Sequence, residues 1–254
     1  MTTTRRTAIA LFLSLGLGLG LTPAPLVYAS AVSSAVEVVH PWLPYFPDEG
    51  VVCTRKMYRE FGSNKVYKTV VVSKSRKRVV SRSTLDGERG VASLLPQGAI
   101  GTSGSSTQRR NGWVIRLEFS SRVPSPHRLK RFQAGSAQIV GSFTVPPRFR
   151  PALVRGTTFG MRVDYRHVGL GTKGLLLDDD ATEVRALGYR TELASIRFTN
   201  VKPRYAGMLR RELRREFTSG VTGTTWVSEG LGMVRSSTTD EDGYSETTWL
   251  VGCE

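Results

Sequence analysis

The sequence predicts a mainly β protein: an antiparallel sheet, a sandwich or an incomplete barrel. Three observations predict this class. Short segments rich in β-branched and aromatic residues recur along the chain, and turns of Gly, Pro and Asp separate them at roughly 8–12-residue spacing. The pattern lacks the strand–helix–strand alternation of a parallel α/β protein. The chain has 254 residues, 39% of them hydrophobic, which is enough for one sizeable core.

The first 31 residues have the features of a secretory signal peptide. Arg5 and Arg6 precede an uncharged run rich in Ala, Leu and Gly, and Ala29-Ser30-Ala31 supplies the small residues of a cleavage site. We therefore expect one secreted domain over residues 32–254, extracellular or associated with the cell wall, exported by the general secretory or the twin-arginine route. An uncleaved anchor is the alternative, although the run is short and interrupted by glycines for a membrane span.

Positive charge is concentrated in the first half of the predicted mature chain. The formal net charge is +15, and residues 32–150 carry 20 Lys and Arg against 7 Asp and Glu. Residues 151–254 carry 14 of each and are neutral. A codon bias towards arginine would enrich both halves of the chain alike, so it does not explain this asymmetry. The asymmetry predicts a basic surface that contacts an anionic partner.

Cys53 and Cys253 are the two cysteines, one near each end of the predicted mature chain. In an exported protein an isolated pair is expected to form a disulfide. Because bonded cysteines have Cα atoms roughly 5.5 Å apart, the first and last strands would then be neighbours. This favours one domain folded back on itself over two domains joined by a linker.

The strands are predicted where β-branched residues cluster or where apolar and polar residues alternate. The clearest alternation runs over Trp113–Phe119, where Trp113, Ile115 and Leu117 share one face with Phe119. The predicted strands are 66–72, 78–84, 113–119, 138–145, 158–168, 183–190, 194–200, 224–228, 232–238 and 245–251.

Two segments are harder to assign. Residues 208–217 have strong helix propensity, with Leu209, Leu213 and Phe217 four residues apart and Glu residues able to pair with arginines. The β-rich neighbourhood favours a strand instead, and a strand is our prediction. Gly101–Thr107 is a low-complexity run of Gly, Ser and Thr, which predicts an exposed flexible loop.

A short C-terminal motif carries a resemblance to known proteins. Residues 224–235 contain Trp226, Gly230, Gly232 and Val234 in the pattern W-x-x-x-G-x-G-x-V. This resembles the hairpin of exported bacterial β-proteins, which include curved-sheet domains similar to lipoprotein-carrier and mycobacterial lipid-binding half-barrels. Tyr45–Gly50 resembles the Y-x-P-x-x-x-G entry of such chains, with the glycine one residue early. The resemblance implies a single curved antiparallel sheet, half-barrel or sandwich-like, with little helix.

Two sets of residues are candidates for binding. The apolar set, for which a lipid-facing role and ordinary core packing are the two interpretations, comprises Trp113, Ile115, Leu117, Phe119 and Trp226. The basic set, expected to contact an anionic surface, lies on a predicted hairpin and comprises Lys74, Arg76, Lys77, Arg78 and Arg82. Arg109, Arg110, Arg128, Lys130 and Arg131 are expected to extend the basic surface, and a solvated face without a partner is the alternative. Only Tyr67 supplies an aromatic ring near the basic set, so specific nucleic-acid recognition is not expected.

The sequence offers little for catalysis or metal binding. His40, His127 and His167 have no ligand spacing, and the serines lie on no nucleophile elbow. The acidic runs 178–180 and 240–242 lack the alternating spacing of a calcium loop and are expected to be solvated turns. We therefore predict no catalytic residues, no metal and no cofactor.

The expected function is that of a secreted, non-enzymatic β-protein that binds a lipid-like ligand in a concave sheet while its basic half docks on the anionic cell envelope. The alternative is a surface adaptor without a small ligand. Such an adaptor would bind teichoic acid, phospholipid head groups or DNA through the basic half. An extracellular hydrolase would need a clustered acid–base pair, for which the sequence gives no evidence.

Overall fold

The structure is a computed structural model that describes residues 39–60, 62–85, 89–110, 112–177, 182–216, 222–239 and 243–254. The predicted signal peptide and both acidic runs lie outside these residues. The strands are β1 (Val52–Arg59), β2 (Lys65–Lys74), β3 (Arg78–Ser83), β4 (Arg89–Leu94), β5 (Ile100–Arg110), β6 (Trp113–Val123), β7 (Gly135–Thr144), β8 (Thr158–Leu176), β9 (Glu183–Thr199), β10 (Thr222–Ser228), β11 (Gly232–Thr239) and β12 (Ser245–Cys253). The helical elements are η1 (Leu43–Tyr45), η2 (Pro96–Gly98), α1 (Pro126–Lys130), η3 (Pro147–Ala152), η4 (Pro203–Tyr205) and α2 (Ala206–Glu216).

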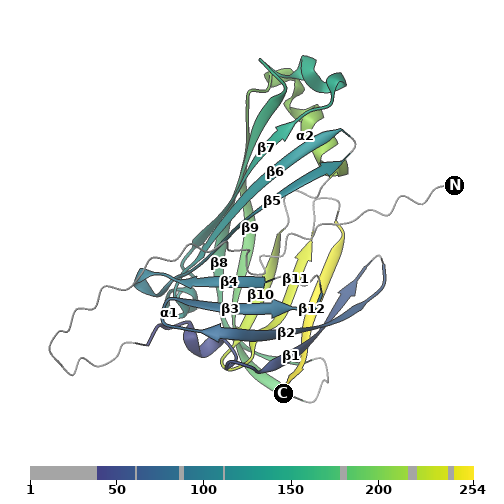
Figure 1. The fold of residues 1–254 in the computed structure, drawn as a ribbon. Helices are drawn as coiled ribbons and strands as arrows, with labels where there is room; N and C mark the ends of the chain where they lie inside the picture. The colour runs from purple at the N-terminus through teal and green to yellow at the C-terminus, as the bar shows by residue number, and fades with distance from the viewer. Residues whose placement is uncertain are drawn as a thin grey trace, which may run out of the picture.

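The strands form a closed antiparallel barrel in which each pairs with its neighbours along the chain (Figure 1). β1 pairs with β2 on one side and with β12 on the other, so the first and last strands complete the ring. The prediction of an open half-barrel or a sandwich-like sheet is therefore wrong, although the mainly β, antiparallel character is confirmed. The inward–outward alternation of side chains is the same in an open and a closed sheet, so that pattern does not report closure.

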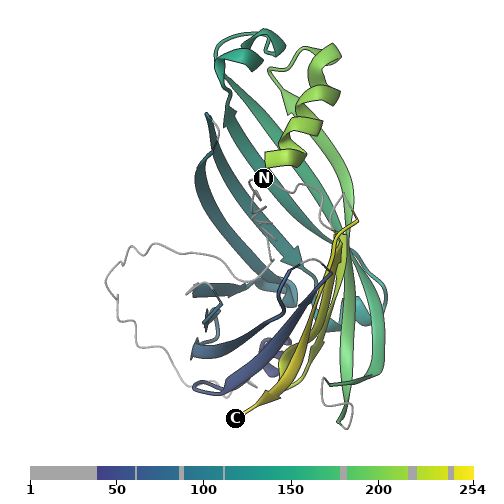
Figure 2. The ribbon, with the colours of Figure 1, turned by 90° about the vertical axis from the view of Figure 1, so that its right-hand side faces the viewer.

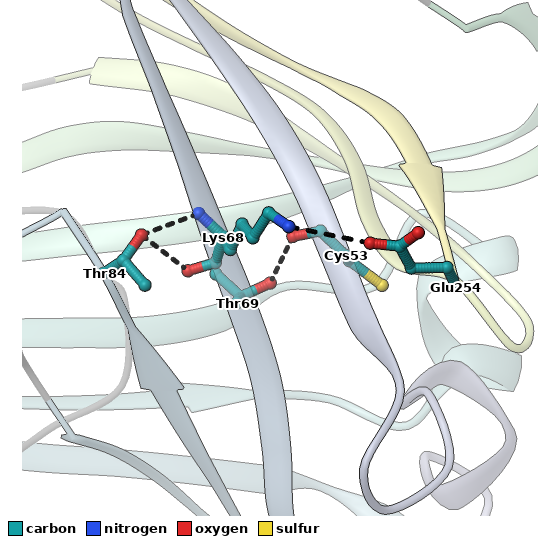
Figure 3. Close-up of polar contacts among 5 residues, drawn as sticks. All are labelled: Cys53, Lys68, Thr69, Thr84 and Glu254. Atoms are coloured by element: carbon teal, nitrogen blue, oxygen red, sulfur yellow. Dashed lines mark hydrogen bonds and ion pairs between the residues drawn. The ribbon is translucent and has the colours of Figure 1, made fainter.

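The predicted disulfide is present and crosses the seam of the barrel. Cys53 of β1 and Cys253 of β12 are bonded and lie opposite each other in the strand register. Beside them Val52 and Glu254 exchange two backbone hydrogen bonds, of 2.9 and 3.0 Å. Figure 3 shows Lys68 of β2 reaching past β1 to the Glu254 carboxylate, with Nζ and Oε1 3.6 Å apart. Both of these side chains are exposed, so we assign the seam's strength to the disulfide and the backbone pairs.

Part of the sheet extends beyond the closed ring. Within the described residues, β5 pairs with β4 only at Gly101 and Ile100, and the rest of β5 pairs with β6 alone. On the other side, β9 pairs with β10 only over Leu187–Thr191 and then continues beside β8. These outer portions of β5–β9 form a curved five-stranded extension (Figure 2), which we name the upper sheet.

The contested segment is a helix as far as it is described, to residue 216, so the strand prediction there is wrong; residue 217 lies outside the described residues. α2 follows β9 and η4 and lies against the upper sheet (Figure 2). Leu209 is fully buried there, in a cluster with Trp113, Phe149 and Leu153. The local propensity for helix therefore acts together with burial of an apolar side chain. None of the helices in the described ranges is long and apolar enough to span a membrane.

The low-complexity run is a strand, so the loop prediction for Gly101–Thr107 is also wrong. β5 pairs with β6 in continuous register from Ile100 to Arg110. Its small side chains make room for the larger ones of β6, since a Cβ at Gly104 would lie 2.5 Å from the ring of Phe119. Backbone pairing holds this strand although its side chains contribute little apolar surface.

Candidate anion-binding site

Three chain connections meet at the outer end of the upper sheet. They are the end of β5 with the turn that follows it (109–112), the β7–β8 connection (145–157, which contains η3) and the β9–α2 connection with the start of α2 (200–211). We name them together the tip. η3 and α2 are visible at the top of Figure 2. Leu153 forms a β-bridge with Val201, and the Lys202 amide donates to the Ala152 carbonyl at 2.9 Å. The second and third connections are therefore joined through their backbones.

Asn200 fixes this junction with its side chain. Its Nδ2 donates to the carbonyl oxygens of Arg155 (2.8 Å) and Thr158 (2.6 Å), and its Oδ1 accepts from the Arg155 amide (3.1 Å). Asn200 has a left-handed backbone, with φ of 63°. Asn adopts that conformation more readily than most residues. The position of Arg155 is thus set by backbone contacts and does not depend on its own side chain.

Aromatic rings pack against the arginines and the connections of the tip. The rings of Trp113 and Phe149 pack with their centroids 5.2 Å apart, which ties η3 to the start of β6. The Arg148 guanidinium carbon lies 4.8 Å from the Phe149 ring centroid, and that of Arg204 lies 4.9 Å from the Tyr205 ring. Stacking on a ring orients a guanidinium while leaving its edge donors in solvent.

All charged side chains of the tip are positive. Its three connections contain nine Arg and Lys residues and no Asp or Glu, and the next residue of α2 is Glu212. Lys202 donates from Nζ to the Pro151 carbonyl at 3.0 Å. Within the described part of the chain, six exposed arginines of the tip form no ion pair; they are Arg109, Arg148, Arg150, Arg155, Arg204 and Arg211. Like charges held together without counter-charges attract anions and raise their local concentration.

The basic set predicted from the sequence lies elsewhere. Lys74 is engaged by the segment before β1, because its Nζ donates to the Phe46 carbonyl (2.9 Å) and pairs with Asp48 (3.0 Å). Arg76, Lys77 and Arg78 are exposed at the β2–β3 turn, whereas Arg82 is exposed near the far end of β3, opposite Arg89 of β4. The β2–β3 turn lies at the same end of the barrel as α1 (Figure 1). We name this end, with the β2–β3 and β4–β5 turns, the α1 end.

The expected continuity between the hairpin and Arg109 is therefore wrong. Successive turns of an antiparallel meander alternate between its two ends, so the β5–β6 turn that holds Arg109 lies away from the β2–β3 turn. Arg128, on α1, does lie at the hairpin's end. Counting charges by halves of the sequence missed the tip, because Lys202, Arg204 and Arg211 belong to the half that is neutral overall. The signal that could have found it is three arginine-containing connections that lack acids.

The predicted ligand-facing set is divided between separate places. Trp113, Ile115 and Leu117 are 1%, 2% and 4% exposed and belong to the cluster beneath α2. Phe119 is half-buried against Gly104 of β5. Trp226 belongs to a different cluster, which contains the disulfide, and Lys173 lies over its ring at 4.4 Å. The structure thus brings three of the five residues together, packed against other side chains.

His167 lies in a buried hydrogen-bonded group inside the protein. Its Nε2 is 2.9 Å from Ser121 Oγ and its Nδ1 is 2.9 Å from Thr191 Oγ1. The side chain is fully buried, and burial lowers its pKa to about 4, which keeps the imidazole neutral. Two hydroxyl groups satisfy both ring nitrogens, as a histidine enclosed in a core requires.

Comparison with known proteins gives similarity to solved structures. No protein-family model and no curated protein matches the chain. A candidate exported protein with a YmcC-like fold from Bacteroides fragilis is similar at a TM-score of 0.41 and 12% identity, over 82% of this chain and 97% of that one. A candidate lipoprotein from Parabacteroides distasonis is similar at a TM-score of 0.40 and 16% identity, over 83% of this chain and 98% of that one.

Proposed function

We propose that this protein is an exported, non-enzymatic β-barrel that binds a phosphate-bearing anionic polymer of the cell envelope through its tip. The observation that carries the proposal is the set of six exposed arginines, without ion pairs in the described residues, on three connections that contain no acid. The predicted signal peptide and the Cys53–Cys253 disulfide support a site of action outside the cytoplasm.

Phosphate suits these arginines in geometry and in charge. A guanidinium presents parallel N–H donors that match two phosphate oxygens, and charge-assisted bonds of this kind are stronger than neutral ones. Near an anionic surface each basic residue contributes about 1 kcal/mol, so a group of six gives useful affinity only when several engage at once. A polymer with repeated phosphates meets that condition.

The apolar and aromatic groups of the tip favour a polymer over a nucleic acid or a bilayer. Phe149 is 9% exposed and lies under Arg148, so its ring is not presented for stacking with a base. Val154 is the one large apolar side chain that is well exposed among the described tip residues, which is little for insertion into a membrane. The contact we propose is therefore electrostatic and carried by arginine.

The test compares two triple variants with equal changes in charge. Binding of a fluorescent glycerol-phosphate polymer is measured by anisotropy for the wild type, for Arg148→Gln/Arg150→Gln/Arg204→Gln at the tip, and for Lys77→Gln/Arg78→Gln/Arg82→Gln on the hairpin. We expect the tip variant to lose at least tenfold in affinity and the hairpin variant to stay within about twofold. Wild-type affinity should fall steeply between low and high salt.

Each other outcome has a meaning. Equal losses in both variants would show that binding follows net charge alone, and loss in the hairpin variant only would restore the basic set as the site. Binding to phosphatidylglycerol vesicles, without binding to the free polymer, would replace the polymer with a lipid surface. Failure of the wild type to bind either probe would overturn the proposal.

A lipid-like ligand is the second candidate, and one observation favours it. The upper sheet is open, and α2 covers the apolar inner face that includes Ile115 and Leu117. Such a ligand would have to replace side chains that already fill this space, so we rank it second. Native mass spectrometry tests it: an adduct that organic solvent extracts would support a lipid ligand, and a clean apo mass would count against one.

A further inference from the structure

A hollow on the outer surface of the α1 end has a different character from the tip. Its volume is about 370 Å³, within the usual range for small-ligand sites of about 300–1,000 Å³. It lies between the β4–β5 turn, the end of β6, α1 and the start of β7. Ala99, Ala134 and Gly135 line it, and their small size leaves the space open.

The backbone around this hollow is closely packed. Arg122 of β6 lies opposite Ser136 of β7, and both line the hollow. A Cβ at Gly135 would lie 2.4 Å from the Arg122 carbonyl oxygen and 2.6 Å from Pro124 Cδ, so only glycine permits this approach. The hollow is thus formed by paired strands, which hold Arg122 and Ser136 in fixed register.

Its charged lining consists of two arginines. Arg122 and Arg128 are exposed, and in the described part of the chain neither forms an ion pair. Arg128 donates from Nε to the Gln133 side chain at 2.5 Å, which holds the guanidinium through one edge. Among the described residues, no acidic side chain lines the hollow.

Arg122 differs from Arg166, the arginine on the other side of Ser136 in the sheet, in having no ion-pair partner among the described residues. Arg166 of β8 lies on the other side of Ser136, and its Nη2 pairs with Glu192 of β9 at 2.8 Å. Arg166 thus has its counter-charge within the protein. Arg122, on β6 at the opposite side of Ser136, has no counter-charge among the described residues, although it borders a space large enough for a ligand.

We infer that this hollow binds a phosphate monoester, with Arg122 and Arg128 on the phosphate and the Ser136 hydroxyl donating to a further oxygen. Two guanidinium groups and a hydroxyl suit a tetrahedral dianion with three free oxygens better than a planar carboxylate with two. The remaining volume can hold a body of about the size of one sugar ring. Gln97, which lines the hollow from the β4–β5 turn, offers an amide to such a body.

The test uses glucose 6-phosphate as the probe, with glucose and acetate as comparison compounds, titrated by calorimetry at fixed ionic strength. We expect Arg122→Gln and Arg128→Gln each to weaken binding by about tenfold or more. Arg131→Gln removes the same charge from an exposed residue near α1 that does not line the hollow, and should bind as the wild type does. Thermal unfolding of each variant confirms that it is folded.

The outcomes separate this site from the tip. The tip variant Arg148→Gln/Arg150→Gln/Arg204→Gln should bind the probe as the wild type does, whatever its affinity for the polymer. Absence of binding by the wild type, equal binding of acetate, or unchanged affinity in both Arg122→Gln and Arg128→Gln would each overturn the inference.

Discussion

Cys53 and Cys253 are bonded across the line where β1 meets β12, although 200 residues separate them in the chain. The bond lies at the seam of the barrel, next to the backbone pair of Val52 and Glu254. In a meander whose successive strands pair, contact between the first and last strand closes the sheet. The disulfide therefore fastens the contact that defines the architecture.

We expect removal of this disulfide to destabilise the barrel. The chain-entropy model gives an upper limit of about 5 kcal/mol for a loop of this length. Urea unfolding of Cys53→Ser/Cys253→Ser should show a loss of roughly 2–5 kcal/mol. A reductant should destabilise the wild type by a similar amount and leave the variant unchanged. Equal stability of variant and wild type would show that strand pairing alone holds the seam.

One feature of the sequence indicates that the barrel is closed, but the alternation of apolar and polar residues does not. The predicted Cys53–Cys253 bond already required the first and last strands to be neighbours. The resemblance of residues 224–235 to open half-barrels nevertheless favoured an open sheet. Alternation predicted β6 well, because Trp113, Ile115 and Leu117 are buried while Arg116 and Glu118 are exposed. Such a pattern gives the face of a strand but not its number of partners.

Burial of His167 predicts a loss of stability in mild acid. Its pKa is about 4 in the folded protein and about 6.5 when unfolded, so the unfolded chain binds the proton more tightly. The stabilisation is complete above pH 6.5 and falls as the pH drops towards 4, by roughly 3 kcal/mol at most. The measurement is the free energy of unfolding in urea between pH 7 and pH 4.5.

Two variants isolate this effect. His167→Gln should flatten the dependence above pH 4.5, whereas His127→Gln, at an exposed histidine, should leave it unchanged. Hydrogen bonds from arginines lower the carboxyl pKa values of Asp164 and Glu192, so the stability that these groups add is lost only as the pH falls below about 5, at the bottom of this range. The same slope in His167→Gln as in the wild type would assign the effect to other groups.

Packing of Leu209 predicts that this side chain anchors α2 to the upper sheet. Its side chain is fully buried in the cluster that includes Trp113 and Phe149. Leu209→Ala should cost about 2–5 kcal/mol, because the cavity adds to the lost transfer free energy. Chemical denaturation measures this. A loss below 1 kcal/mol would mean that α2 is not anchored at this position.

A substitution at Gly207 tests whether α2 is helical in solution. Gly207 lies in α2 with a negative φ, and a Cβ there would meet nothing within 4 Å. Gly207→Ala should therefore stabilise the protein by about 0.5–1 kcal/mol, since Ala is the better helix former. A destabilised variant would argue that this part of the chain is not helical in solution.

The grouping of arginines at the tip could not be predicted from the sequence. Its arginines come from 109–112, 145–157 and 200–211, and the neutral balance of residues 151–254 concealed the last group. The α2 segment has strong local helix propensity, but its β-rich surroundings favoured a strand. The contacts of Asn200 join the second and third of these ranges, and the Trp113–Phe149 contact joins the first. Such contacts link residues far apart in sequence, and a periodic pattern does not encode them.

The most direct measurement of the proposed function is arginine footprinting. The wild type is modified with phenylglyoxal with and without a glycerol-phosphate polymer, and each arginine is quantified by peptide mass spectrometry. We expect the polymer to protect Arg148, Arg150 and Arg204, while Arg78 and Arg82 stay as reactive as in the free protein. Protection of Arg78 and Arg82 with full reactivity at Arg148 and Arg150 would contradict binding through the tip.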